Sequence, residues 1–112
     1  MAMDTVLHAI ADPSRRTVLE LLRQRPATVG EIAAGLPIAR PGVSRHLRVL
    51  REAGLVEARS DAQRRVYSLR AEALTEVDEW LEPYRVIWER RLGALHTEIA
   101  RGKSTQGKKD RP

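Results

Sequence analysis

The fold of this chain is decided by residues 28–69, which read TVGEIAAGLPIARPGVSRHLRVLREAGLVEARSDAQRRVYSL. The stretch predicts a short helix, a tight turn, a second helix, a strand, a basic loop and a second strand. Thr28 and Glu31 have the spacing of a capping box at the start of the short helix. Gly35 and Pro37 mark the turn that follows it.

The second of these helices, expected over Arg40–Ala53, has two chemically different sides. Pro41 suits a first helical turn, and Gly54 is typical of the residue that ends a helix. An apolar side of Val43, Leu47 and Leu50 predicts packing on a core. The other positions carry residues that can reach a partner: Arg40, Pro41, Ser44, Arg45, His46 and Arg48.

The flanking sequence predicts a mostly helical domain with one small β-hairpin. The strands of the hairpin are expected at Leu55–Arg59 and Arg65–Leu69, around a loop at 60–64. Helices are expected at Asp4–Ala11, from Pro13 to about Gln24, and from Ala71 to about Ala100, where Pro83 should kink or split the last one. We expect one domain at residues 1–100 and a disordered basic tail at 101–112.

The net charge of +5 is unevenly distributed. Seven arginines and three acidic residues fall at 40–65, so this stretch carries a net charge of +4, whereas 66–100 carries −3 and the tail +4. A polyanion is the simplest partner for such a layout. The competing interpretation is ordinary solvated surface.

Composition excludes several classes of protein. The 112 residues contain no cysteine, which removes disulfides, thiolate metal sites and cysteine catalysis. No apolar run reaches the ~20 residues that span a bilayer, and the N-terminus does not resemble a signal peptide. The three histidines are far apart, and no phosphate loop or nucleophile motif is present. We therefore expect no enzyme activity, cofactor, metal or membrane contact, and a cytoplasmic location.

The basic helix and hairpin together predict binding to double-stranded DNA. Arginine binds guanine through two hydrogen bonds and serine reaches a base or a phosphate, so Ser44, Arg45 and Arg48 are candidate readers. Arg40 is better placed for a phosphate. The hairpin tip, with Gln63, Arg64 and Arg65, is expected to reach the minor groove or the backbone. For His46 two interpretations stay open: a packed residue at the edge of the core, or a phosphate contact.

Trp80, Tyr84 and Trp88 recur every four residues on one side of the last helix. We interpret this stripe as a dimer interface built by the first and last helices, because aromatic residues are enriched at the centre of such interfaces. Packing within the chain and an apolar ligand pocket are the alternatives. The interface residues expected are Leu7, Ile10, Trp80, Tyr84, Trp88, Leu92 and Leu95.

Four motifs together resemble the ArsR family of bacterial winged-helix repressors: residues 12–16 (DPSRR), 43–50 (VSRHLRVL), 53–56 (AGLV) and 64–69 (RRVYSL). The resemblance covers roughly residues 4 to 100. It implies a winged helix-turn-helix fold, a homodimer on an inverted repeat that blocks transcription, and base contacts at Arg40, Ser44, Arg45 and His46.

Residues 80–85 with Trp88 and Leu92 resemble a branch of that family that lacks metal sites and often represses its own gene. This chain has neither the cysteines nor the Asp and His ligands of the family's metal sensors. The resemblance implies a bacterial, nucleoid-associated protein. A small-molecule effector between the terminal helices is an alternative that no residue supports. Gln63 stands where the hairpin tip often has glycine, and Ala39 where a capping serine is common.

Overall fold

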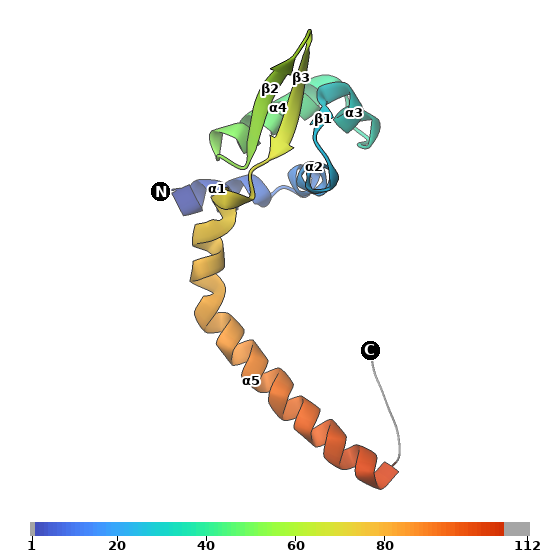
Figure 1. The fold of residues 1–112 in the computed structure, drawn as a ribbon, viewed down its shortest axis with the longest axis vertical. Coiled ribbons are helices and arrows are strands. Elements are labelled where there is room, and N and C mark those ends of the chain that lie inside the picture. The colour runs from blue at the N-terminus through green and yellow to red at the C-terminus, as the bar shows by residue number, and fades with distance from the viewer. Residues whose placement is uncertain (1, 107–112) are drawn as a thin grey trace. The chain divides into compact units, whose positions relative to one another are not determined.

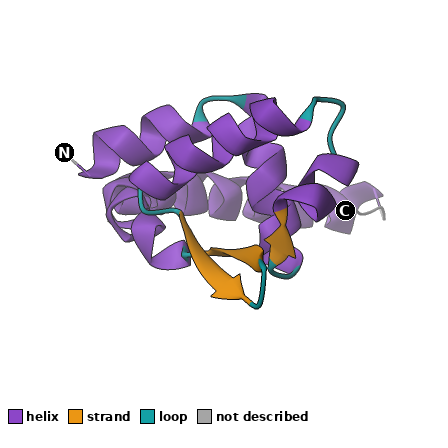
Figure 2. Cartoon of the chain, turned by 90° about the horizontal axis from the view of Figure 1, so that it is seen from above, coloured by secondary structure: helices purple, strands orange, loops and turns teal. Residues whose placement is uncertain are grey.

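A computed structural model describes residues 2–106 of the chain (Figure 1). In chain order the elements are α1 (Ala2–Ile10), α2 (Pro13–Gln24), β1 (Ala27–Thr28), α3 (Val29–Ala34), α4 (Arg40–Glu52), β2 (Val56–Asp61), β3 (Arg64–Leu69), the 3-10 helix η1 (Ala71–Leu74) and α5 (Thr75–Gln106). The chain is mostly helical with one small sheet, as the colours of Figure 2 show. It divides into two units, of which the first ends at Val77 and the second begins at Asp78.

The start of α2 binds the end of α1. Asp12 is the N-cap of α2 and accepts a hydrogen bond of 3.1 Å from the backbone N–H of Arg15. The Arg15 side chain then turns back and donates to the carbonyl oxygen of Ala9 at 2.6 Å. Arg16 donates in the same way to Ile10 at 2.8 Å. Carbonyl groups at the end of a helix lack partners inside it, so these two arginines satisfy several of those of α1.

Helices α3 and α4 begin and end much as the sequence predicts. Both bonds of the capping box between Thr28 and Glu31 are present. Ala39 gives α4 no side-chain cap. At the other end, Gly54 has a φ of +80°, and the N–H of Leu55 donates to the carbonyl of Leu50 at 3.0 Å. Only a residue without a Cβ adopts this left-handed conformation readily, which explains why the helix stops there.

The three strands form an antiparallel sheet in the order β1-β3-β2. The predicted loop at 60–64 is wrong: Ser60 pairs with Arg65 and Asp61 with Arg64, so only Ala62 and Gln63 form the turn. The ladder continues this far because a two-residue turn joins twisted antiparallel strands directly. Ala62 has a φ of +58° and Gln63 is not in the left-handed region, which is the sign pattern of a type II′ turn. Strand β1, which pairs with β3, was not predicted.

The core of the first unit lies between helices α1, α2, α3 and α4 and the inner face of the sheet. Val43, Leu47 and Leu50 of α4 are at most 1% exposed and anchor that helix. Because these three residues fix one side of α4, its opposite side is left to solvent. The remaining buried core residues are Val6, Ala9, Val18, Leu22, Ala27, Ile32, Leu55, Val56 and Tyr67.

Helix α5 passes through Pro83 without being split. Proline removes an N–H from the helix interior, which leaves a carbonyl in the preceding turn without its usual partner. Next to this position, Arg85 donates to the backbone carbonyl of Asp78 at 3.2 Å, and also to the carboxylates of Asp78 and Glu82. The helix is described through Gln106, beyond the boundary expected at residue 100, and residues 107–112 of the expected tail lie outside the described residues.

Candidate nucleic-acid interface

The side of α4 that faces solvent carries most of the predicted reading residues. Its exposed residues there are Arg40, Pro41, Ser44, Arg45 and Arg48. The guanidinium of Arg45 reaches back toward the first turn of the helix, since a Cβ on Gly42 would lie 3.9 Å from its Nη2 atom. In the described part of the chain neither Arg40 nor Arg45 has a carboxylate within ion-pair distance. Their charges are therefore available to a partner.

The structure brings Arg40 together with the tip of the β2–β3 hairpin. One hollow of about 320 Å³, which we call the arginine hollow, is lined by Thr28, Val29, Arg40, Gln63, Arg64 and Arg65. Arg40 lies against α3, because its Nη2 atom is 3.4 Å from the position of a Cβ on Gly30. In the sequence these basic residues belong to two separate segments, Arg40 to a helix and Arg64 and Arg65 to a hairpin. In the folded chain they line the same hollow.

The two hairpin arginines differ in their partners. Arg64 forms an ion pair of 3.2 Å with Asp61 across the turn. The guanidinium carbon of Arg65 lies 5.7 Å from the centre of the Tyr67 ring, within the range of a cation–π contact. Tyr67 is buried, so this contact holds the guanidinium of the exposed Arg65 near a fixed part of the core.

A carboxylate lies near the arginine hollow but is already bound. The backbone N–H of Thr28 donates to Glu31 at 2.8 Å, and the Thr28 hydroxyl donates at 3.2 Å. These two bonds, with smaller contributions from Arg25 and Arg64, lower the pKa of Glu31 against a weaker effect of burial. Glu31 is therefore ionised at neutral pH and is used to start α3.

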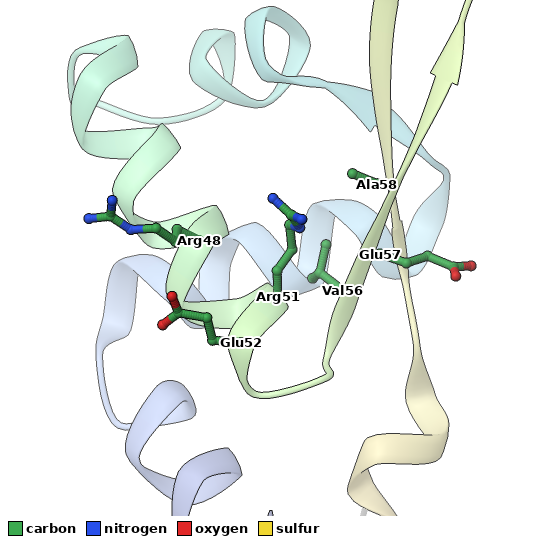
Figure 3. Close-up of a pocket in the computed structure, with 6 residues that line it drawn as sticks. All are labelled: Arg48, Arg51, Glu52, Val56, Glu57 and Ala58. Atoms are coloured by element: carbon green, nitrogen blue, oxygen red, sulfur yellow. The ribbon is translucent and has the colours of Figure 1, made fainter.

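Arg48 does not line the arginine hollow. It lines a second hollow of about 510 Å³ between the end of α4 and strand β2, together with Arg51, Glu52, Val56, Glu57 and Ala58 (Figure 3). In this view the guanidinium groups of Arg48 and Arg51 extend from α4, and Glu57 points away from the helix. Arg51 is an exposed cation that we did not name as a candidate, although it follows Arg48 by one helical turn.

His46 is half-buried and lies near the start of α2. Its charge is among the smaller influences that lower the pKa of Asp12, of which the largest is the hydrogen bond from the backbone N–H of Arg15. This position agrees with the interpretation of His46 as a packed residue at the edge of the core. A phosphate contact by His46 stays a prediction.

The predicted interface residues of α5 are exposed. Trp80, Tyr84 and Trp88 are 43–50% exposed, Leu92 63% and Leu95 54%. The rings of Trp80 and Tyr84 contact each other, with 5.1 Å between their centres. Three further large apolar residues that the sequence analysis did not name are also exposed: Val86, Ile87 and Ile99. In α1, Leu7 is 37% exposed, whereas Ile10 is half-buried and packs on the core.

The described residues provide neither a metal site nor a membrane-spanning helix. Among the side chains that the structure describes, no three of His, Cys, Asp or Glu come together in a way that could bind a metal ion. Within residues 2–106, no helix combines the length and apolar character needed to cross a bilayer.

A short capped helix, a turn, a helix with a buried back and a basic outer side, and a β-hairpin define a winged helix-turn-helix DNA-binding domain. Residues 12–58 match the family described as bacterial regulatory protein, arsR family. The chain belongs to this family. It is a transcriptional regulator with a DNA-binding domain and not an enzyme.

Two relatives show how close the similarity is. The chain is 42% identical over 89 residues to the HTH-type transcriptional regulator Rv2034 of Mycobacterium tuberculosis, covering 80% of each chain. It is 35% identical over 79 residues to the transcriptional repressor SdpR of Bacillus subtilis, covering 70% of this chain and 88% of SdpR.

Solved structures with a similar fold support this family assignment. The ArsR family transcriptional regulator RHA00566 superposes with a TM-score of 0.71 at 31% identity, covering 80% of this chain and 98% of that one. The homodimeric winged helix-turn-helix DNA-binding domain of Mb0332 from Mycobacterium bovis gives a TM-score of 0.60 at 28% identity, covering 81% and 82%.

Proposed function

We propose that the protein is a repressor that binds an inverted-repeat operator as a homodimer. The observation that carries this proposal is α4, whose buried apolar side leaves Ser44 and Arg45 exposed on the other. The similarity to the repressor SdpR supports repression as the outcome. A dimer that covers a promoter would exclude RNA polymerase without any further chemistry.

In this proposal α4 lies in the major groove and the hairpin contacts the adjacent backbone or minor groove. Ser44 and Arg45 reach base edges, where arginine distinguishes guanine by its two acceptor atoms. Two copies of α4 would enter successive major grooves about 34–36 Å apart. Pro41, His46 and Arg48 complete the predicted set on α4, and Arg40, Gln63, Arg64 and Arg65 contact the backbone.

The dimer is proposed to form through the first and last helices. Exposure of large apolar side chains to water is unfavourable, and several on α5 are about half exposed. An exposed apolar face of this kind is typical of an interface. The homodimeric state of the Mb0332 domain supports a homodimer here. The contributing residues would be Leu7, Ile10, Trp80, Tyr84, Trp88, Leu92 and Leu95.

An apolar effector bound at the aromatic residues of α5 is the competing proposal. A thermal-shift screen separates the two, since an effector would stabilise the protein saturably and would also release DNA. We propose that the protein belongs to the branch without metal sites and acts at the nucleoid in the bacterial cytoplasm.

The deciding experiment is a fluorescence-anisotropy titration with duplex from upstream of the protein's own gene, with random duplex as competitor, at two salt concentrations. Tight binding that resists the competitor, with two protomers per duplex, supports a sequence-specific repressor of its own gene. Binding that random duplex abolishes would contradict this operator assignment.

A further inference from the structure

The arginine hollow lies between two elements that are proposed to contact DNA in different ways. Arg40 comes from the start of α4, and Arg64 and Arg65 come from β3 of the hairpin. All three side chains are exposed, so a group from outside can reach them. A ligand in this space would therefore contact the reading helix and the hairpin at once.

Two of the three positive charges are not neutralised within the protein. Asp61 pairs with Arg64 at 3.2 Å. In the described part of the chain, no carboxylate lies within 4.0 Å of the guanidinium nitrogens of Arg40 or Arg65. Glu31 is occupied by its hydrogen bonds to Thr28. The hollow thus carries an excess of positive charge that an anion would relieve.

Both of these arginines lie close to other parts of the protein. The Nη2 atom of Arg40 is 3.4 Å from the position that a Cβ on Gly30 of α3 would take, and the guanidinium carbon of Arg65 is 5.7 Å from the centre of the Tyr67 ring. A guanidinium presents its N–H groups in a flat fork that matches the oxygens of a phosphate. Since less side-chain freedom is lost on binding, positioned arginines bind such a group more tightly than mobile ones do.

We propose that the arginine hollow binds one phosphate group of the DNA backbone, shared by Arg40 and Arg65. This inference rests on the proposed DNA binding and adds a specific site to it. The shared phosphate would fix the hairpin and α4 to the same point of one DNA strand, and so set the orientation of α4 in its groove.

The test uses random duplex of fixed length, because a phosphate contact does not depend on sequence. Full-length wild type, Arg40→Gln, Arg65→Gln and the double variant are titrated by anisotropy over a range of salt concentrations. Arg23→Gln is the matched control, because Arg23 is an exposed arginine of α2 that pairs with Glu20. Circular dichroism verifies that each variant is folded.

Each neutralised phosphate contributes about 0.9 to the slope of log K against log salt. If Arg40 and Arg65 share one phosphate, the double variant should lose about 0.9 per bound protomer, and the two single losses should not add. Arg23→Gln should leave the slope unchanged. A loss of about 1.8 in the double variant would indicate two separate phosphates and overturn the shared site.

Two further outcomes are distinct. Unchanged slopes in all variants would overturn the phosphate site while leaving DNA binding intact, whereas a wild type that binds no duplex would overturn both proposals.

Inorganic phosphate, titrated at constant ionic strength, tests the other source of the same group. Saturable release of duplex by phosphate that the substitutions abolish, with unchanged salt slopes, would assign the hollow to a free anion and overturn its assignment to DNA.

Discussion

The Nε atom of Arg15 donates a hydrogen bond of 2.6 Å to the carbonyl oxygen of Ala9, so the second helix closes the end of the first. The same guanidinium also donates to the carbonyl of His8 at 3.2 Å. The Arg15 side chain is only 13% exposed, and water cannot easily replace it. The angle between α1 and α2 is thus held by side-chain bonds to backbone and not by packing alone.

Replacing Arg15 should destabilise the first unit. Arg15→Ala leaves the carbonyls of His8 and Ala9 without this donor, and we expect the free energy of unfolding to fall by about 1–3 kcal/mol. Urea unfolding followed by circular dichroism measures it. Arg16→Ala is the control, because Arg16 is exposed and water can take its place. Equal losses in the two variants would contradict the role given to burial.

The hairpin turn should gain stability from glycine at one position only. Ala62 has a φ of +58°, a region that costs a residue with a Cβ roughly 1 kcal/mol. Ala62→Gly should therefore raise the free energy of unfolding by up to about 1 kcal/mol. Gln63→Gly should not, because Gln63 is not in the left-handed region. A gain at 63 and none at 62 would show that the turn is of another type.

Acid should weaken the start of α3. The pKa of Glu31 is lowered below its ordinary value of 4.5, chiefly by the hydrogen bond from the N–H of Thr28. A lowered pKa in the folded state means that the stabilisation is complete above pH 4.5 and is lost as the pH falls through the lowered value. Urea unfolding of wild type and Glu31→Gln from pH 7 to pH 3 should show a stability difference that is constant at first and then shrinks. A difference independent of pH would refute this account.

Arg45 should set base preference. Once an operator is known, Arg45→Ala should weaken specific binding by roughly 1–3 kcal/mol and relax the preference at one base pair. Anisotropy titrations with the operator and its single-base variants measure both effects. Arg23→Ala is the control, since Arg23 is an exposed arginine of α2 that pairs with Glu20. Unchanged affinity and preference would remove Arg45 from the reading residues.

A charge in the aromatic face of α5 should prevent dimerisation. Trp88→Glu, at a residue that is 49% exposed in the single chain, would place a carboxylate in an apolar interface, and a monomer that no longer binds operator is expected. Light scattering after gel filtration gives the mass. Glu89→Lys changes charge at the neighbouring position and serves as the control. A folded Trp88→Glu dimer that still binds operator would rule out this interface.

The sequence predicted those parts of the fold that depend on local periodicity and on start and stop signals. The helical spacing of Val43, Leu47 and Leu50 located α4, and Gly54 located its end, because both signals lie within a few residues of what they determine. Strand β1 escaped because its two residues are too few to show a period. The turn was drawn too long because Ala62, unlike glycine, does not signal a left-handed conformation.

The sequence indicated candidate residues for the site, but not how these residues are arranged in space. Arg40 and Arg65 share a hollow only because β3 pairs with β1 in a particular register, and pairing between distant segments leaves no trace in local spacing. The contact of Arg15 with Ala9 was missed for a related reason. In the sequence, residues 12–16 stand out only as a family motif, and a side chain that turns back across a loop follows no helical period.

The alternation of side chains along β3 limits how the hairpin can change in evolution. Arg65 lies on the same face of β3 as the buried Tyr67, because side chains alternate along a strand. Inserting one residue between them, with a matching one in β2, would move Arg65 to the opposite face and away from α3. Inserting two residues per strand would restore its face but would move it about 6.6 Å along the strand, out of the hollow. Insertions at the tip beyond Arg65 and Ser60 would leave its face and its distance from Tyr67 unchanged. Relatives that keep a cation in the hollow should therefore vary in length at the hairpin tip, and should keep one residue between the cation and the buried aromatic residue.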